Sequence, residues 1–269
     1  MSHGRTMRLV KAHAYGNDFL LAEAAQIDAR ADRAAIARRV CDRHRAIGAD
    51  GLIFLTATPD GAETQLWNAD GSPSEVSGNG IRCVGAWLAR AGNLTPGAEL
   101  IIGTGAGGRR LRLLETTGSR HTFRAAMGAP TELRQEQLAV AGQTITAVVM
   151  RVGNPQCVVI GPATPDRLHS IGAGLATHPF FPAGTNVELA TVEAPDRVRI
   201  LIWERGVGPT EASGTGACAA AVAAAAYGGA ARSVDVVAPG GTQRVEWTAD
   251  DIWLTGWAEV VGTIDWLMD

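Results

Sequence analysis

The sequence contains a long internal repeat, which constrains the fold more than any other feature. Residues 67–80 read WNADGSPSEVSGNG, and residues 203–216 read WERGVGPTEASGTG. Trp, Pro, Ser or Thr, Glu, Ser and both glycines of a Gly-x-Gly recur in register. Weaker pairs have nearly the same spacing: Gly16-Asn17 with Gly153-Asn154, and Gly48 to Asp50 with Gly184 to Asn186. A repeat of roughly 130 residues predicts two homologous domains, because solenoid repeats run to only about 20 to 50 residues.

Short runs rich in β-branched residues predict strands at 8–14, 51–55, 147–152, 157–160 and 198–203. An amphipathic surface helix is expected at 32–44, and a helix should follow each repeated Ser-Gly-x-Gly, at 80–91 and 216–227. The last of these helices is apolar on all sides, so it should run through the centre of a sheet or barrel. The fold class is therefore α+β, with two pseudo-symmetric domains that each wrap a mixed β-sheet or barrel around a central apolar helix.

The domain boundaries follow from the repeat. We expect an N-terminal domain at 1–120, completed by the final segment 257–269, and a C-terminal domain at 121–256. Because the two copies should face each other, the functional site is expected between them.

Composition excludes several classes of function. Lys and Arg number 24 and Asp and Glu number 27, which gives a net charge of −3 without any block of like charges. We therefore expect a small-molecule partner, and neither nucleic acid nor a membrane. The longest apolar run, 217–227, is well short of the ~20 residues that cross a bilayer. The N-terminus has no apolar signal segment, so the expected location is the cytoplasm, and a homodimer is compatible with the sequence.

Cysteine and lysine content limits the cofactors. The four cysteines lie far apart without a C-x-x-C pair, so we expect buried thiols rather than a zinc site or disulfides. Lys11 is the only lysine, which leaves one candidate for a pyridoxal-phosphate Schiff base. We therefore expect no metal and no organic cofactor.

In each copy a serine, Ser77 or Ser213, directly precedes Gly-x-Gly at the start of a helix. Helix N-termini offer free N–H groups and a partial positive charge, so a carboxylate can bind there. Two facing copies would hold one carboxylate and place both serines beside the adjacent carbon. Serine is also the commonest N-cap, but duplication of the whole motif favours a functional site. The patterns of serine hydrolases, dinucleotide-binding proteins and P-loop proteins do not occur around either serine.

Six motifs resemble the diaminopimelate epimerase family over nearly the whole chain. They are KAHAYGNDF (11–19), DRHRAIGADG (42–51), WNADGSPSEVSGNGIR (67–82), GNPQ (153–156), GTNVE (184–188) and ERGVGPTEASGTGACAAA (204–221). The resemblance implies a cofactor-independent isomerase of two similar α+β domains, which inverts an α-carbon of LL- or meso-diaminopimelate in lysine and cell-wall precursor biosynthesis. In that family, opposed cysteines precede the two Gly-x-Gly turns and carry the two proton transfers.

The sequence departs from the family at these two positions, where it has Ser77 and Ser213. A thiol has a pKa near ~8.5, which a helix N-terminus lowers further, whereas an aliphatic hydroxyl is a far weaker acid. Two explanations are open: cysteines replaced by serine in an otherwise ordinary epimerase, with impaired activity, or a natural Ser/Ser branch that needs a helper base. Gln156, where the family usually has His, favours the second explanation.

The resemblance also assigns the other site residues. Ser77 and Ser213 take the two catalytic positions. The substrate would be bound by residues of the two helix starts and by six polar side chains: Gly78, Asn79, Gly214 and Thr215, and Asn17, Asn68, Asn154, Asn186, Glu204 and Arg205. The helix starts offer N–H groups to the α-carboxylate, and the Glu and Arg side chains would meet an ammonium and a carboxylate. Two other functions stay open: another amino-acid racemase or isomerase of the same superfamily, and a non-catalytic amino-acid-binding protein.

Overall fold

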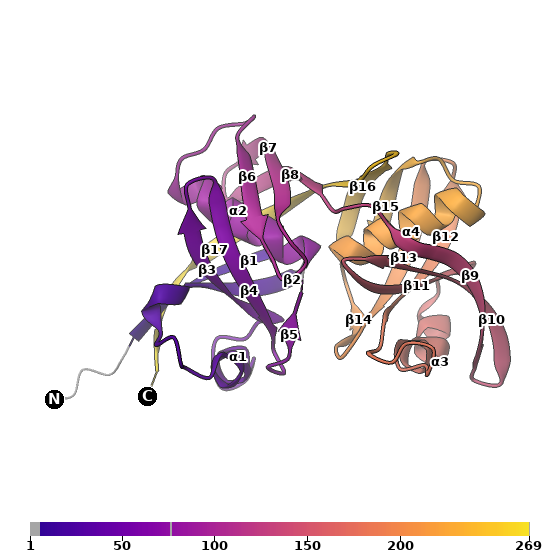
Figure 1. Ribbon diagram of the computed structural model, residues 1–269, viewed down its shortest axis with the longest axis horizontal. Coiled ribbons are helices and arrows are strands. Elements are labelled where there is room, and N and C mark those ends of the chain that lie inside the picture. Colours follow the sequence, from indigo (N-terminus) through magenta and orange to yellow (C-terminus); the bar gives the residue numbers. More distant parts are fainter. Residues whose placement is uncertain (1–5, 76, 269) are drawn as a thin grey trace. The chain divides into compact units, whose positions relative to one another are not determined.

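The computed structural model describes residues 6–75 and 77–268, and its contacts divide the chain into two compact units (Figure 1). The N-terminal unit comprises Met1–Ala125 and Trp257–Asp269, and the C-terminal unit comprises Ala126–Gly256. Strand β8 (Arg120–Ala126) begins where the sequence placed the first boundary, and the N-terminal unit extends almost to the end of this strand. The outermost residues of the expected domains, 1–5 and 269, lie outside the described residues.

The N-terminal unit is a mixed sheet whose strands pair in a ring. In spatial order the ring consists of β17 (Ile252–Leu267), β1 (Thr6–Ala14), β2 (Asn17–Glu23), β3 (Gly51–Thr58), β4 (Gly61–Asn68), β6 (Glu99–Gly103), β7 (Arg109–Thr117) and β8, which pairs again with β17. The pairs β2–β3 and β4–β6 are parallel. A 3-10 helix, η1 (Ala24–Gln26), follows β2, and the short strand β5 (Pro73–Ser74) pairs with β4.

The C-terminal unit repeats this order. Its strands pair in the sequence β9 (Thr131–Val140), β10 (Gln143–Val152), β11 (Asn154–Ile160), β12 (Asn186–Ala194), β13 (Arg197–Glu204), β15 (Ser233–Ala238), β16 (Gly241–Trp247) and β17. The short strand β14 (Gly208–Thr210) pairs with β13, as β5 does with β4. The parallel pairs β11–β12 and β13–β15 stand in the places of β2–β3 and β4–β6. The internal duplication is therefore a duplication of structure.

A central helix lies against the inner face of each sheet. Helix α2 (Gly78–Ala91) packs on β1, β2, β4, β6 and β7, and α4 (Gly214–Tyr227) packs on β10 to β13, β15 and β16. Every residue of α4 from Gly214 to Ala224 is buried, as its uniformly apolar sequence predicts. The predicted α+β fold, with a sheet or barrel around a central helix in each half, is confirmed.

Two outer helices cover the opposite faces of the sheets. Helix α1 (Arg33–Val40) packs on β3 and β4, and α3 (Pro165–Ala176) packs on β12 and β13. Strand side chains alternate between the two faces. On β12, Val187 and Leu189 belong to the cluster around α3, so Asn186 and Glu188 project toward the face that α4 covers. This alternation decides which polar groups can reach the start of α4.

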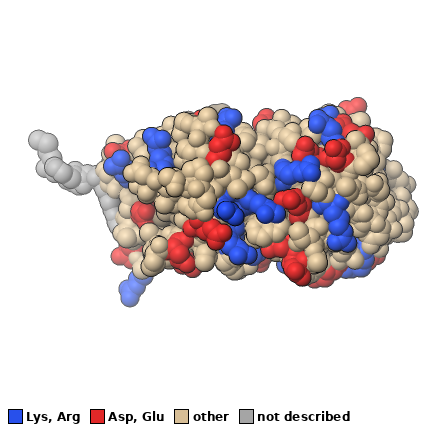
Figure 2. Space-filling model, turned by 90° about the horizontal axis from the view of Figure 1, so that it is seen from above, with Lys and Arg blue, Asp and Glu red and all other residues tan. Residues whose placement is uncertain are grey.

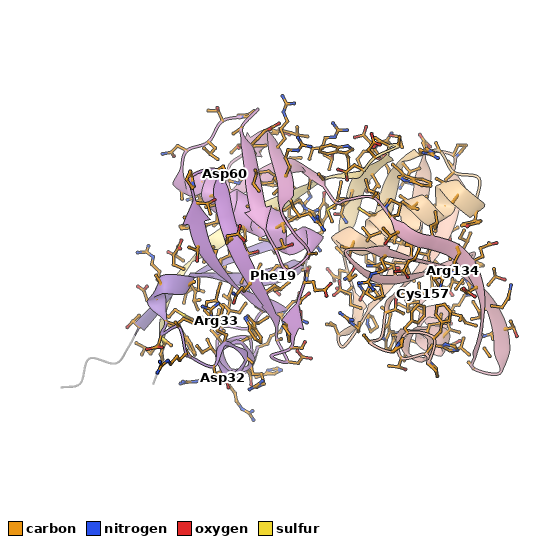
Figure 3. All side chains as sticks on the ribbon, in the orientation of Figure 1. Phe19, Asp32, Arg33, Asp60, Arg134 and Cys157 are labelled. Atoms are coloured by element: carbon orange, nitrogen blue, oxygen red, sulfur yellow. The ribbon has the colours of Figure 1, made fainter. Side chains whose placement is uncertain are left out.

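The helix boundaries differ from the predictions for local reasons. Both helices after the repeated motif begin two residues earlier, because each serine is itself the N-cap. Helix α1 starts after Asp32, labelled in Figure 3, whose carboxylate accepts the Ala35 N–H at 3.0 Å, and it ends at Val40 rather than 44. Helix α3 was not predicted, although the Thr164 cap and Pro165 in the first turn are helix-start signals.

Basic and acidic side chains are interspersed on the face shown in Figure 2, without an extended region of one sign there. Across the described ranges, no helix is long and apolar enough to cross a bilayer.

Candidate active site

Ser77 stands at the start of α2 in the N-terminal unit. Its Oγ accepts a hydrogen bond from the Gly80 N–H at 3.0 Å, so the serine caps the helix. The N–H groups of a first helical turn have no acceptor within the helix, and they carry the positive end of the helix dipole. The anion site predicted at Gly78 and Asn79 depends on this arrangement.

A tight turn between β1 and β2 places Asn17 beside α2. Tyr15 (φ 55°) and Gly16 (φ 90°) both have positive φ, as a two-residue hairpin turn requires. Trp257 anchors the side chain of Tyr15, because its backbone N–H donates to the phenol oxygen at 3.2 Å. Asn17 follows the turn as the first residue of β2 and is buried.

Asn17 connects α2 to the loop before β3. Its Oδ1 accepts a hydrogen bond from Asn79 Nδ2 at 3.1 Å, and its own Nδ2 donates to Asp50 Oδ2 at 2.7 Å. Asn79 in turn accepts a hydrogen bond from Arg82, which is fully buried one turn further along α2. The structure thus brings together two residues that the sequence assigned to the site, and it fixes both carboxamides.

Asp50 belongs to an ion network that the sequence analysis missed. Arg43 Nη2 lies 2.6 Å from Asp18 Oδ1 and 2.8 Å from Asp50 Oδ1, and Lys11 also pairs with Asp18. Burial by itself raises the pKa of Asp18, but the hydrogen bonds from Arg43 and Lys11 outweigh it and hold this pKa below its usual value. The sequence feature that could have indicated this network is the set of charged residues in the motifs at 11–19 and 42–51, which had no assigned role.

Asn68, the fourth predicted polar residue of this unit, lies at the end of β4. Its Nδ2 donates to Ser72 Oγ at 2.9 Å within the turn that follows the strand. The backbone carbonyl of Asp50 accepts the Ala69 N–H at 2.9 Å, so the same acidic residue that orients Asn17 also holds this turn.

Ser213 has the equivalent place at the start of α4 in the C-terminal unit. Its Oγ accepts the Gly216 N–H at 3.2 Å and lies 3.5 Å from Thr215 Oγ1. Ser213 is buried, whereas Ser77 is half-buried. Two of the predicted residues of this half, Ser213 and Thr215, are therefore in contact.

The other predicted polar residues of this unit lie on or directly after β11, β12 and β13, which are among the strands that α4 covers. Gln156 Nε2 donates to Asn154 Oδ1 at 2.5 Å on β11. Asn186 Oδ1, at the start of β12, accepts the backbone N–H of Arg205 at 2.9 Å. The Arg205 side chain is exposed and donates to the Ala183 carbonyl at 2.9 Å. Glu204 ends β13.

Glu188 is the most unusual group in this unit. It lies on β12 with no exposed surface, and among the described residues neither carboxyl oxygen has a hydrogen-bond partner. Burial, and to a smaller extent the charge of Glu204, raises the pKa of Glu188 well above its ordinary value. Glu188 lies in the motif at 184–188, but the sequence indicated no role for this residue. The available signal was a carboxylate between the apolar residues Val187 and Leu189.

The four cysteines are buried, as predicted. Burial raises the pKa of Cys41 and Cys83 to about 12, so neither thiol supplies thiolate at neutral pH. Cys157, labelled in Figure 3, belongs to the apolar cluster around α3. In the part of the chain that the structure describes, no group of three or more His, Cys, Asp or Glu residues could hold a metal ion.

Comparison with known sequences covers both halves of the chain. The profile of the family described as diaminopimelate epimerase matches residues 9–132 and 148–261. A diaminopimelate epimerase from Desulforudis audaxviator is 41% identical over 281 residues, which cover 97% of this chain and 99% of the relative. One from Moorella thermoacetica is 38% identical and covers 98% of this chain and 100% of the relative.

Solved structures share the fold at much lower identity. A hydroxyproline epimerase from Agrobacterium vitis matches with a TM-score of 0.77 at 17% identity, over 100% of this chain and 94% of that chain. A methylitaconate-delta-isomerase matches with a TM-score of 0.64 at 12% identity, over 98% of this chain and 96% of that chain. Because the family profile matches both halves and the relatives align over nearly their full length, this chain belongs to the diaminopimelate epimerase family.

Proposed function

We propose that this protein is a cofactor-independent epimerase that inverts an α-carbon of LL- or meso-diaminopimelate, a step in the biosynthesis of lysine and cell-wall precursors. The observation that carries the proposal is the duplicated helix start, in which a serine caps the central helix of each unit within a family named for this reaction. The names of the relatives support the substrate. The asparagine carboxamides around the helix starts suit the polar groups of an amino acid.

In this proposal Ser77 and Ser213 hold the two positions of a two-base inversion. One serine Oγ removes the α-proton while its own hydroxyl proton passes to a neighbouring acceptor, and the other serine delivers a proton to the opposite face of the carbon. The first-turn amides at Gly78-Asn79 and at Gly214-Thr215 stabilise the charge that develops on the α-carboxylate.

The remaining predicted residues recognise the rest of the substrate. Glu204 and Arg205 would meet its second ammonium and carboxylate, because a guanidinium binds a carboxylate with two charge-assisted hydrogen bonds. The polar groups would be oriented by the four asparagines, Asn17, Asn68, Asn154 and Asn186. The cytoplasmic location and the homodimer expected from the sequence stay predictions.

A second candidate is a non-catalytic protein that binds diaminopimelate. The observation in its favour is that both serine oxygens are already engaged as helix caps. A hydroxyl is also a much weaker acid than the thiol that the family uses.

Deuterium uptake separates the two candidates. The unmodified protein and the double variant Ser77→Cys/Ser213→Cys are incubated with diaminopimelate in heavy water, and label at the α-carbon is followed alongside a calorimetric binding isotherm. An epimerase site predicts binding by both forms and at least ~10²-fold faster exchange in the double variant, the lower range for a positioned acid or base. Ser170→Cys, on the exposed surface of α3, is the control for adding a thiol. Binding without exchange in either form supports the binding protein, and absence of binding refutes diaminopimelate as the ligand.

A further inference from the structure

The carboxyl group of Glu188 lies directly against the first turn of α4. A methyl group on Gly216 would stand 2.6 Å from Glu188 Oε1 and 3.2 Å from Ser213 Cβ. The carboxyl and the serine therefore border the same small space, which stays open because residue 216 is glycine. The strand alternation on β12 aims Glu188 into this space and away from α3.

Nothing in the fold of the described residues explains the carboxyl at this place. It is fully buried without a hydrogen-bond partner, and a buried polar group without a partner costs stability. Gln156 Oε1, on the neighbouring strand, is likewise buried without a partner. Such groups are retained where function needs them or where a ligand or water completes them.

The equivalent place in the N-terminal unit is apolar. The register Leu21↔Ile53 of β2–β3 corresponds to Val158↔Glu188 of β11–β12, so Ile53 is the counterpart of Glu188. A methyl group on Gly80 would stand 3.1 Å from Ile53 Cδ1 and 3.2 Å from Ser77 Cβ. The two serines thus have the same backbone geometry. One has an alkyl group and the other a carboxyl group beside its helix. Glu75, which lines a small pocket with Ser77, is exposed to solvent rather than buried.

We infer that Glu188 exchanges a proton with Ser213 during inversion and so acts as the helper that a serine in this position needs. The inference rests on the proposed function and deepens it. When Ser213 Oγ takes the α-proton, the C–H bond breaks, a new Oγ–H bond forms, and the original hydroxyl proton passes to the Glu188 carboxylate. In the reverse direction the neutral carboxyl returns this proton to Oγ while Ser213 donates its own proton to the carbanion.

The surroundings suit both states of this carboxyl. Burial raises the pKa of Glu188 and so favours its neutral form, and the charged or titratable side chains near it are Glu204 on β13 and Cys157 on β11. Helix α4 contributes no charged side chain, but its N-terminal dipole stabilises the carboxylate when the proton leaves. With Glu188 neutral, Ser213 can act as the proton donor. With Glu188 ionised, as proton donation leaves it, the carboxylate can accept the hydroxyl proton when Ser213 acts as the base.

The test compares Glu188→Gln, which keeps shape and removes the exchangeable proton, with the unmodified protein. Glu193→Gln, an exposed carboxylate on the same strand that pairs with two arginines, is the matched control. We expect α-deuterium exchange to fall at least ~10²-fold in Glu188→Gln, with diaminopimelate affinity unchanged within threefold, and no change in the control. The pH profile of exchange should lose one ionisation in Glu188→Gln. Glu188→Ile, which copies Ile53, should behave like Glu188→Gln and guards against an effect peculiar to the amide.

An infrared measurement tests the proton on Glu188 without any substrate. At neutral pH the unmodified protein should show a protonated carboxyl band that is absent from Glu188→Gln and present in Glu193→Gln. Absence of this band, or exchange in Glu188→Gln at the unmodified rate with the same pH profile, overturns the inference. If the band is present but no form binds diaminopimelate, the proposed substrate fails while the protonated carboxyl stands.

Discussion

Replacing one serine at a time with cysteine should raise the rate of α-proton exchange by different amounts at the two positions. Ser77 Oγ accepts the Gly80 N–H at 3.0 Å and has Ile53 beside it, whereas Ser213 has Glu188 beside it. The pKa of an aliphatic hydroxyl lies several units above the ~8.5 of a thiol. At ~1.4 kcal/mol per unit, two of these units expressed in the transition state amount to a factor of ~10². A first-turn dipole contributes only ~0.3 to 1 kcal/mol, so it does not close the gap for Ser77.

We therefore expect Ser77→Cys alone to raise α-proton exchange at least ~10²-fold and Ser213→Cys alone to raise it less than ~10-fold. The assay is deuterium incorporation into LL- and meso-diaminopimelate in heavy water, with a binding isotherm for each variant to confirm equal occupancy. In the Glu188→Gln background the Ser213→Cys change should become as effective as Ser77→Cys. Equal gains at both positions in the presence of Glu188, or a larger gain at 213, would refute the reasoning.

Three further predictions concern binding and stability. Arg205→Ala should weaken diaminopimelate binding more than ~10-fold by calorimetry, as expected for a charge-assisted contact, while Arg167→Ala on the outer helix should leave it unchanged. Asp50→Ala should release the Asn17 carboxamide and lower the melting temperature by about 2–8 °C, because the hydrogen bonds lost leave buried donors unpaired; an unchanged melting temperature and affinity would contradict the role of the network. Folding raises the pKa of Glu188. The stabilisation linked to its protonation is therefore complete below its pKa in the unfolded chain, near ~4.5, and is lost as the pH rises toward its pKa in the folded protein. In urea unfolding from pH 5 to 8, the free energy of unfolding of Glu188→Gln should rise relative to that of the unmodified protein by up to ~1.4 kcal/mol per pH unit. A difference that stays constant with pH would contradict the raised pKa.

The architecture could be predicted because the sequence contains an internal duplication. Two copies of one motif, each before a helical run, indicated two similar units, and the uniformly apolar run before Tyr227 indicated that its helix is central. Helix α3 could not be placed as easily, because its start is marked only by short local signals. The domain boundary was difficult for another reason. Strand β17 serves both units, and no composition change marks the crossing at Gly256.

The polar network could not be predicted, because it joins residues that are far apart in the chain. Arg43, Asp18 and Asp50 meet only after β2 and β3 have paired in parallel, with Phe19 opposite Gly51. Sequence spacing alone gives no such pairing, since charged residues in loops are usually solvated.

The offset of the repeat indicates the wrong counterpart for Glu188 in the N-terminal unit. The offset that aligns Gly48 to Asp50 with Gly184 to Asn186 would set Glu188 opposite Leu52, which packs on the outer face with α1. The strand registers shift this alignment by one residue, so that Glu188 corresponds to Ile53 on the inner face. A shift of one residue in a strand moves every side chain to the other face of the sheet, so the role of this carboxyl depended on a register that the sequence did not specify.

Asp18 in the N-terminal unit is ion-paired, whereas Glu188 in the C-terminal unit is not paired among the described residues. This difference limits where proton transfer can occur. In the N-terminal unit Asp18 is paired with Arg43 and Lys11, which lowers its pKa and keeps it charged at neutral pH. A carboxylate in this condition can orient Asn17 and Asn79 through Asp50, but it does not take up a proton. In the C-terminal unit Glu188 has no partner among the described residues, so its protonation state can change. Duplication has thus produced one half-site with fixed charges and one with an exchangeable proton. In a protein with serine at both base positions, rapid α-proton exchange should therefore require a thiol mainly at position 77.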